Sequence, residues 1–305
     1  MDNIQFARRP VGAIRPGDHG WLPYSGTEER DTVVGPFVAE ALETQEKVVY
    51  VTDARPERLP GLRSLSRLAL CGFTESRQLR IIPRAKACLD DRGRFDPDLM
   101  LTTLRGEFER AFDEGFRAAR LTVDYTWLLR RPGGAALTQM LGCEHHLDDA
   151  VAPSTMAMAL CQVDRNACLP DELAALRAKH EVLVEADPQY DDGVLKIART
   201  FDPPGLRLEG ELDAVRHTAF LEELVRLQRV RRAVHLDFSE LGFIDLAGLN
   251  LLSQHATALP DGGALILDHL SSNVENVIQM VGWHRLPGLA RGQENGETGT
   301  GGATK

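Results

Sequence analysis

Six residues combine chemistry and position suited to holding a small ligand. They lie in or directly after three short apolar segments and are His19, Trp21, Tyr24, Asp124, Trp127 and Cys161. Imidazole, carboxylate, thiol and aromatic groups supply hydrogen bonds and stacking surfaces to bound molecules. If the apolar segments are parallel strands, ligands bind at their carboxyl ends, so we place these residues in one candidate ligand pocket. The alternatives are a core or turn histidine at His19 and a small buried apolar residue at Cys161.

A second group of donor side chains follows Cys143. It reads Cys-Glu-His-His and continues to Asp148 and Asp149. The spacing matches no standard zinc site. On a helix, His145 and Asp149 share a face at i and i+4, which suits a solvated ion pair equally well. The pattern predicts no metal site and no cofactor.

Catalytic motifs are missing from the sequence. A P-loop needs a lysine on the phosphates and a Ser or Thr on Mg²⁺, yet no lysine here follows a glycine or precedes a Ser or Thr. Glu28 and Glu29 lie where that loop belongs and would repel a triphosphate. Asp124 ends an apolar segment as a Walker-B aspartate does, but turn formation explains it equally well. A Gly-x-Ser-x-Gly elbow is also absent. We expect no enzyme.

Composition narrows the class of protein. The chain has 305 residues, which favours two domains, and its 43% hydrophobic and 26% charged residues are ordinary for a globular protein. A net charge of −10 argues against a nucleic-acid partner. No apolar run has the roughly 18 residues of a membrane span, and the N-terminus resembles no signal peptide. Five cysteines without a Cys-x-x-Cys pair indicate reduced thiols and a cytoplasmic location.

The elements that must position the candidate pocket alternate between strand and helix. After a leader at 1–16, strands are predicted at 19–24, 47–53, 79–82, 118–124, 156–163 and 182–185, with helix-length segments between them. This alternation predicts an α/β domain over 17–190 with a mostly parallel sheet between helices. A second α/β domain is predicted over 193–290. Residues 291–305 are too polar and too rich in glycine to form a core and are predicted to be disordered.

The second domain is organised around residues 233–252. Residues 233–238 are typical of a buried strand, which Ser239 and Glu240 are expected to end. Asp245 then stands at the N-cap of a helix whose leucines recur at helical spacing. The first turn of such a helix exposes free N–H groups and suits partner recognition.

This segment resembles the signature of the STAS domain, the module of bacterial anti-sigma-factor antagonists. GLRLEGELD at 205–213 and SNVENVIQMVGW at 272–283 lie in the STAS order on either side of it. In those antagonists the helix opens Asp-Ser-Ser-Gly or Asp-Thr-Ser-Gly, and a kinase phosphorylates the serine before the glycine. Here the stretch is Asp245-Leu246-Ala247-Gly248, so the resemblance implies that Ala247 removes the phosphorylation site.

The first domain resembles the MEDS domain, named for DcmR-type sensors of methanogens and methylotrophs. The resemblance lies in residues 19–53, with Tyr24-Ser-Gly-Thr-Glu-Glu29, and in Asp124-Tyr-Thr-Trp127 and Leu160-Cys-Gln-Val-Asp164. It implies a RecA/KaiC-like fold that senses small hydrocarbon derivatives and is paired with an output domain.

Together the two resemblances imply a regulatory protein. A small molecule or the redox state would act on the first domain and control partner binding by the second, through Asp245, Leu246, Ala247, Gly248 and Leu249. The expected partner is an anti-sigma factor or a related switch protein. Two alternatives stay open: a scaffold that forms a homo-oligomer through STAS surfaces, and a nucleotide-using enzyme of RecA-like fold.

Overall fold

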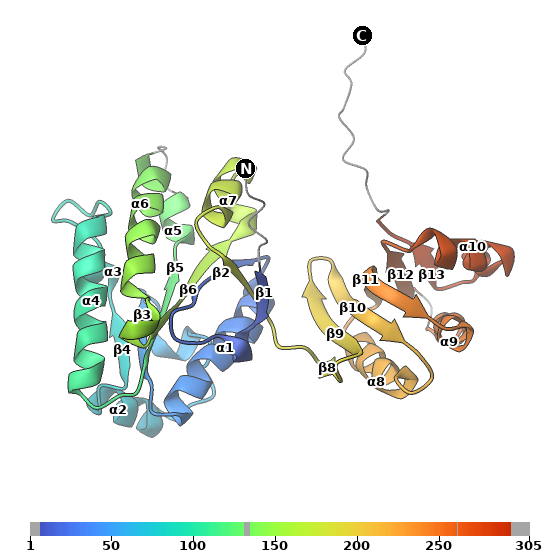
Figure 1. Cartoon of the computed structure of the whole chain (residues 1–305), viewed down its shortest axis with the longest axis horizontal. Coiled ribbons are helices and arrows are strands. Elements are labelled where there is room, and N and C mark those ends of the chain that lie inside the picture. The colour runs from blue at the N-terminus through green and yellow to red at the C-terminus, as the bar shows by residue number, and fades with distance from the viewer. Residues whose placement is uncertain (1–6, 131–134, 261, 294–305) are drawn as a thin grey trace, which may run out of the picture. The chain divides into compact units, whose positions relative to one another are not determined.

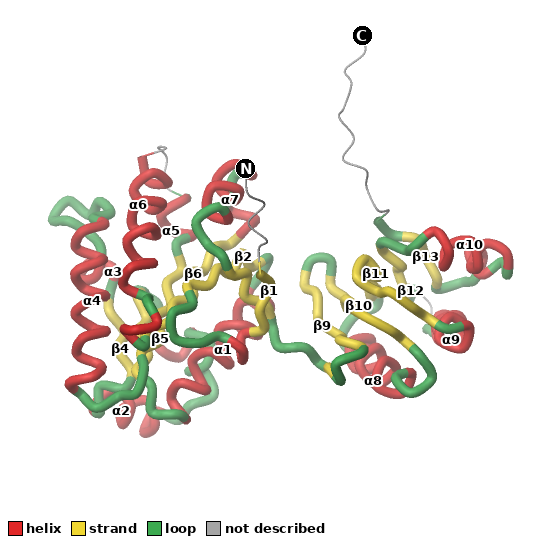
Figure 2. The backbone as a smooth tube through the Cα atoms, in the orientation of Figure 1, coloured by secondary structure: helices red, strands yellow, loops and turns green. Residues whose placement is uncertain are grey.

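The structure is a computed structural model that describes residues 7–130, 135–260 and 262–293. The chain divides into two compact units, residues 1–187 and residues 188–305. We call them the N-terminal unit and the C-terminal unit and describe each by itself. In Figure 2 the strands of each unit run side by side, with helices flanking them.

The N-terminal unit is built on a seven-stranded sheet in which every pairing is parallel. Its spatial order is β1-β7-β2-β6-β5-β3-β4. The strands are β1 (Ala7–Pro10), β2 (His19–Tyr24), β3 (Lys47–Val51), β4 (Leu79–Ile82), β5 (Ala119–Asp124), β6 (Ala157–Asp164) and β7 (Val182–Glu185). The central strands are buried almost throughout, which explains why most of their residues are apolar.

Helices cover both faces of this sheet, so the predicted α/β class is confirmed (Figure 1). Helix α1 (Thr27–Glu43) buries Val34, Phe37 and Val38 against one face. The opposite face packs in one core with α4 (Pro97–Asp113), α6 (Ala135–Ala150) and α7 (Pro170–Arg177). The shorter helices are α2 (Arg67–Glu75), α3 (Arg84–Ala87) and α5 (Thr126–Leu129).

Part of the predicted leader belongs to the sheet, which corrects the prediction for residues 7–16. Residues 7–10 form β1 and pair with β7 at the sheet edge. Val11 and Ile14, which follow, are 1% and 3% exposed. The sequence signal is weak because a four-residue edge strand with two arginines has no apolar alternation.

The C-terminal unit has a six-stranded mixed sheet in the order β13-β12-β11-β10-β9-β8. Its strands are β8 (Tyr190–Asp191), β9 (Leu195–Phe201), β10 (Pro204–Leu212), β11 (Ala233–Ile244), β12 (Ala264–Asp268) and β13 (Leu289–Arg291). Its helices are α8 (His217–Gln228), α9 (Leu246–Thr257) and α10 (Ser272–Met280). Strands β10 to β13 pair in parallel, whereas β8 and β9 are antiparallel. These elements enclose a core of their own.

Strand β11 is longer than predicted. Ser239 and Glu240 do not end it, and it continues to Ile244. Asp237 is the last residue of β11 that pairs with β12. Beyond Phe238, β11 pairs only with β10, and the pairing of β10 with β11 contains two register shifts. The residues in this extension are mostly exposed, so their polarity does not oppose a strand there.

The prediction of disorder is wrong for residues 291–293. Arg291 lies in β13, and the backbone N–H of Gln293 donates to Asp268 Oδ1 over 2.7 Å. Residues 294–305 lie outside the described residues. Among the helices that the structure describes, none is long and apolar enough to cross a membrane.

Candidate functional site

The six predicted ligand residues lie in two separate places in the N-terminal unit. His19 and Cys161 are buried beneath α6, and Trp21 lies beside them on the same face of the sheet. Tyr24, Asp124 and Trp127 line a different pocket at the carboxyl ends of β2 and β5. The single pocket predicted from the sequence is therefore wrong in one respect. His19 begins β2 rather than ending it, so it lies far along the strand from the carboxyl edge.

Four donor side chains converge where His19 and Cys161 meet. They are His19, Glu144, Cys161 and His180, which we call the buried cluster. They come from β2, α6, β6 and the turn between α7 and β7. Their exposed fractions are 8%, 0%, 1% and 4%, respectively. Their ligand atoms all lie within 4.8 Å of one another.

Glu144 is the centre of these contacts. Its Oε2 lies 2.9 Å from His19 Nε2 and 3.1 Å from His180 Nε2. Cys161 Sγ lies 3.3 Å from the same oxygen and 3.1 Å from His19 Nε2. The two imidazole rings are 4.6 Å apart between centroids.

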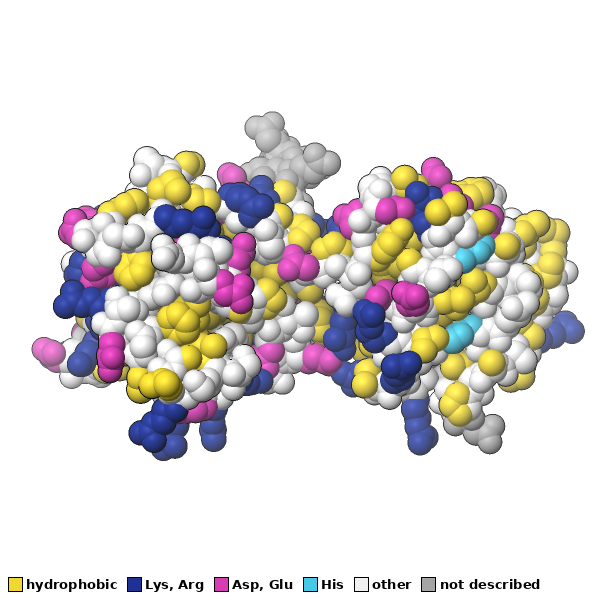
Figure 3. Space-filling view, turned by 90° about the horizontal axis from the view of Figure 1, so that it is seen from below, with side chains coloured by type: hydrophobic (Ala, Val, Ile, Leu, Met, Phe, Trp, Pro, Cys, Tyr) yellow, Lys and Arg dark blue, Asp and Glu magenta, His cyan; other side chains and the backbone are white. Residues whose placement is uncertain are grey.

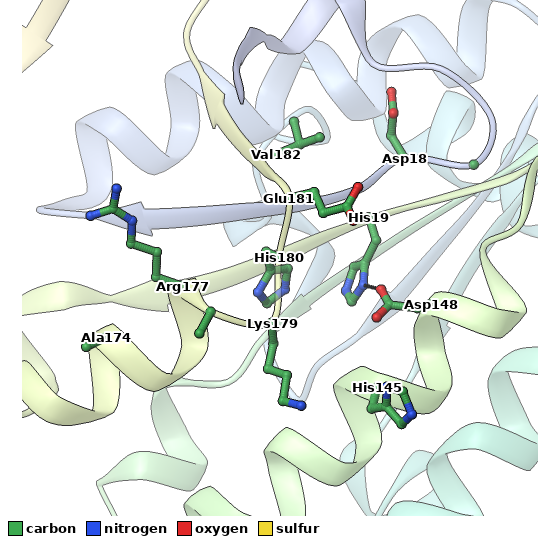
Figure 4. Close-up of a pocket in the computed structure, with 12 residues that line it drawn as sticks. Asp18, His19, His145, Asp148, Ala174, Arg177, Lys179, His180, Glu181 and Val182 are labelled. Atoms are coloured by element: carbon green, nitrogen blue, oxygen red, sulfur yellow. Dashed lines mark hydrogen bonds and ion pairs between the residues drawn. The ribbon is translucent and has the colours of Figure 1, made fainter. Parts of the chain in front are cut away.

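The Nδ1 atoms of both histidines are held from outside the cluster. His19 Nδ1 lies 2.6 Å from Asp148 Oδ1, as Figure 4 shows, and His180 Nδ1 lies 2.9 Å from the Leu176 carbonyl oxygen. A carbonyl oxygen only accepts hydrogen bonds, so His180 Nδ1 is protonated, and the Asp148 carboxylate favours the same state in His19. Both Nε2 atoms are therefore the ones aimed at the centre.

The charged forms of His19, His180 and Glu144 are favoured in this buried site only because each group contacts a partner of opposite charge or a hydrogen-bonding side chain. Burial opposes the charged form of His19, but Cys161 and the Asp148 carboxylate outweigh it and raise the pKa of this imidazole. Burial also opposes charge on His180, yet its contacts with Cys161 and Glu144 raise its pKa to about 9. The pKa of Glu144 is lowered because both histidines outweigh its burial. The site thus favours positive charge around one buried carboxylate.

An open pocket of about 680 Å³ reaches two members of the cluster. Its lining includes His19 and His180, together with Asp18, Arg177 and Lys179. Figure 4 shows His19 and His180 side by side in this pocket, with Asp148 directed at His19 from α6. A small polar molecule that enters this pocket meets the outer side of the buried cluster.

The second pocket, of about 430 Å³, lies at the carboxyl edge of the sheet. The hydroxyl of Tyr24 donates to Asp124 Oδ2 over 2.9 Å, and burial raises the pKa of Tyr24 to about 12. The Arg84 guanidinium lies 4.8 Å from the centre of the Trp127 ring. Four arginines line this pocket: Arg30, Arg58, Arg84 and Arg130. Its chemistry suits an anionic ligand.

Sequence reasoning missed three residues of the first site. Glu144 and Asp148 lie in the donor-rich segment after Cys143, but linear spacing could not relate them to His19. The only available signal was their separation by four residues, which places both on one helix face. His180 gave no signal because it lies in a turn without a motif.

In the C-terminal unit, Asp245 caps α9 as predicted. Its Oδ1 accepts a hydrogen bond from the Gly248 N–H over 2.6 Å, and His217 Nε2 lies 3.0 Å from the same oxygen. Leu246 is 71% exposed, and Ala247 is exposed beside it. Gly248 and Leu249 are buried, so only the first part of the predicted partner-binding segment presents side chains to solvent.

Comparisons with known proteins agree with this division. The family model described as MEDS, MEthanogen/methylotroph, DcmR Sensory domain, matches residues 18–181, and the model described as Mlab, STAS domain, matches residues 195–289. No curated protein matches the chain. Among solved structures, it is similar to the flagellar accessory protein FlaH from Methanocaldococcus jannaschii. The two share 15% identity over 62% of this chain and 80% of that one, at a TM-score of 0.39, which is too low to bear on function.

The predicted order of the two domains is thereby confirmed. The C-terminal unit, with its mixed sheet and capped α9, contains a STAS domain, a type of module that mediates protein–protein interactions. The first match covers more than half of the chain, so this protein belongs to the MEDS family and carries a STAS domain after its MEDS domain.

Proposed function

We propose that the protein is a non-enzymatic regulator in which the MEDS domain controls the binding of an anti-sigma factor, or a related switch protein, by the STAS domain. The observation that carries this proposal is the pairing of a sensory-family domain with a STAS domain whose helix α9 starts at an exposed surface. The control is non-covalent, because Ala247 has no hydroxyl to phosphorylate.

The surface around the start of α9 supports partner binding. Phe243 and Leu246 are 49% and 71% exposed, and Ala247 adds a small exposed apolar side chain in the first turn of α9. The Asp245 carboxylate is engaged by its own helix and by His217, since the Gly248 N–H and His217 Nε2 both contact its Oδ1. A mostly apolar surface of this kind suits a protein partner.

Surface charge is consistent with a protein partner. On the face in Figure 3, basic and acidic side chains are interspersed over both units, and histidine reaches the surface of the C-terminal unit. A nucleic-acid partner would favour a continuous basic face instead.

The sensory part of the proposal relies on the pocket that reaches His19 and His180. A ligand there changes partner binding only if it binds two states of the protein with different affinities. The measurable consequence is a ligand-dependent change in the affinity of the full-length protein, which residues 188–293 alone do not show.

Two baits test the proposal, the full-length protein and residues 188–293, each exposed to cytosol of the native host. We expect one or both to retain an anti-sigma factor, identified by mass spectrometry and then titrated in purified form. Ala247→Asp should weaken its binding at least about 10-fold, because a charge would have to be desolvated in the interface. Aspartate favours the first turn of a helix, so this variant keeps its fold.

Leu68→Asp is the matched control, since Leu68 is 84% exposed but lies on α2 in the N-terminal unit. It should leave the affinity unchanged. If Ala247→Asp binds as well as the wild type, the start of α9 is not the partner surface. If neither bait retains such a partner and both form a fixed oligomer, the scaffold alternative replaces this proposal.

A further inference from the structure

The buried cluster has the donor set and the geometry of a metal centre. We propose that His19, Glu144, Cys161 and His180 bind a divalent transition-metal ion, with Zn²⁺ the ion that they suit best. The inference does not rest on the regulatory role, because metal binding can be measured in the purified protein without a partner.

The donor set selects the class of metal. Two imidazole nitrogens, a thiolate and a carboxylate oxygen are borderline-soft ligands of the kind that zinc takes, whereas Ca²⁺ and Mg²⁺ prefer oxygen alone. A thiolate and a carboxylate together carry the charge that neutralises a divalent ion in a buried site. The ion would replace the Cys161 thiol proton and the Nε2 protons of His19 and His180, and binding would release these protons to solvent.

The distances fit four-coordinate binding after a small expansion. Four of the six distances among the donor atoms run from 2.9 to 3.3 Å, and all six are within 4.8 Å. Around tetrahedral zinc the same kinds of atoms lie about 3.3–3.6 Å apart, from metal–ligand lengths of about 2.0–2.3 Å. The four short contacts would open by a few tenths of an ångström, and side-chain torsions would bring the other two pairs of donor atoms to the same range.

The histidines are oriented as metal ligands usually are. In metal sites a ligating histidine donates its other ring N–H to a carboxylate or a carbonyl oxygen, which fixes the ring. Asp148 holds Nδ1 of His19 in this way, and the Leu176 carbonyl oxygen holds Nδ1 of His180. These contacts aim both Nε2 atoms at one point.

Two buried polar atoms of the cluster have no hydrogen-bond partner. They are Glu144 Oε1 and His180 Nε2. His180 Nε2 lies 3.1 Å from Glu144 Oε2, yet the direction is unsuitable for a hydrogen bond. Buried polar groups are rarely left without a hydrogen-bond partner. Two metal ligands that point at a shared ion, rather than at each other, lie close together without forming a hydrogen bond. An ion at the centre would bond to His180 Nε2 and, through Oε2, to the Glu144 carboxylate.

Metal titration of the full-length protein tests the proposal. The protein is stripped with a chelator and titrated with Zn²⁺, and separately with Co²⁺, whose absorption reports on its ligands. We expect one ion per chain and a cobalt complex with a thiolate-to-metal charge-transfer band. Cys161→Ser should abolish that band. Asp148→Asn, which alters only the support of His19, should weaken zinc binding by roughly 10- to 100-fold.

Two control variants match the test residues in type. Cys71→Ser changes an exposed cysteine and His146→Gln an exposed histidine of α6, so both should keep the wild-type affinity and spectrum. A wild-type cobalt complex without a thiolate band overturns the proposal even if Cys161→Ser fails to fold. Zinc affinity that is unchanged in folded Cys161→Ser and His180→Gln overturns it as well.

Discussion

Lys47 shows how one buried charge constrains the N-terminal unit. It begins β3, and its side chain is only 1% exposed. Its Nζ lies 2.9 Å from Glu107 Oε2 and 2.6 Å from Glu114 Oε2. Glu107 lies within α4, and Glu114 is the residue directly after its end. Burial acts to raise the pKa values of both carboxyls, but Lys47 and neighbouring arginines outweigh it and lower them. The lysine therefore ties α4 to the sheet as an ion.

Replacing this lysine should destabilise the unit in a pH-dependent way. Lys47→Met leaves two carboxylates without their shared cation, and we expect a loss of about 3–5 kcal/mol in the free energy of unfolding at pH 7. The folded pKa values of the glutamates lie below their ordinary value of 4.5, so their contribution is fully present above that pH. It disappears as the pH falls through the folded values.

Urea unfolding at pH 7 and near pH 3 measures this effect. The difference between Lys47→Met and the wild type should shrink at the lower pH. Lys86→Met is the control, because Lys86 is exposed on α3 and should change the unfolding free energy by less than about 0.5 kcal/mol. An equal penalty at both pH values would show that Lys47 contributes by packing rather than by charge.

At the residue scale, two members of the buried cluster, His19 and Cys161, were predicted from the sequence. Glu144 and His180 were missed because the packing of separate elements brings them to the site. His19 and Cys161 stood out because polar or reactive side chains are unusual inside apolar strands. Their proximity follows from the β2–β6 register, which pairs Trp21 with Cys161 and cannot be read from spacing. Glu144 and His180 enter only when α6 and the turn before β7 pack on the sheet. A site assembled from four elements has no linear motif.

Among the elements, β10 shows how one glycine permits a bulge in a strand. Gly210 lies at a register shift against β11 and has a φ of 94°, which L-residues rarely adopt. A Cβ atom at this position would collide with the carbonyl oxygen of Val194, the residue directly before the neighbouring strand β9. The bulge and the close approach both require glycine.

Gly210→Ala should therefore destabilise the C-terminal unit by at least about 2 kcal/mol, from backbone strain and the collision. Gly242→Ala is a matched control on β11, where the nearest atom, Gly210 O, lies at an ordinary 3.5 Å. It should change the unfolding free energy by less than about 0.5 kcal/mol. Chemical unfolding of both variants, followed by circular dichroism, measures the difference. Equal losses would mean that the bulge tolerates a side chain.

An element was predicted where its own residues form a clear apolar or capping pattern. Strands β3, β5 and β6 are buried on both faces and therefore consist of apolar runs. Helix α9 was predicted from its cap, since Asp245 and the leucines that follow form a local pattern. The extension of β11 and the edge strand β1 were missed because exposed or short strands leave few apolar residues. Their pairing partners, rather than their own sequences, determine them.

At the scale of the whole molecule, each unit has a hydrophobic core made of its own residues. One core joins the parallel sheet to α4 and α6, and the other joins the mixed sheet to α8 and α9. The division between the units falls after Asp187. Because each unit buries its own apolar residues, we expect the full-length protein to unfold on heating in two transitions rather than one.

Zinc should separate these transitions further, because all four proposed ligands lie in the N-terminal unit. An ion at about 100 times its dissociation constant stabilises the folded state by about 2.7 kcal/mol. For a unit of this size, that raises the midpoint by roughly 5–10 °C. Calorimetry with and without a chelator should move one transition by this amount and leave the other unchanged. Gly210→Ala should move only the transition that zinc leaves alone. If zinc shifts both transitions together, the two units unfold cooperatively, and a ligand in the MEDS domain has an energetic route to the STAS domain.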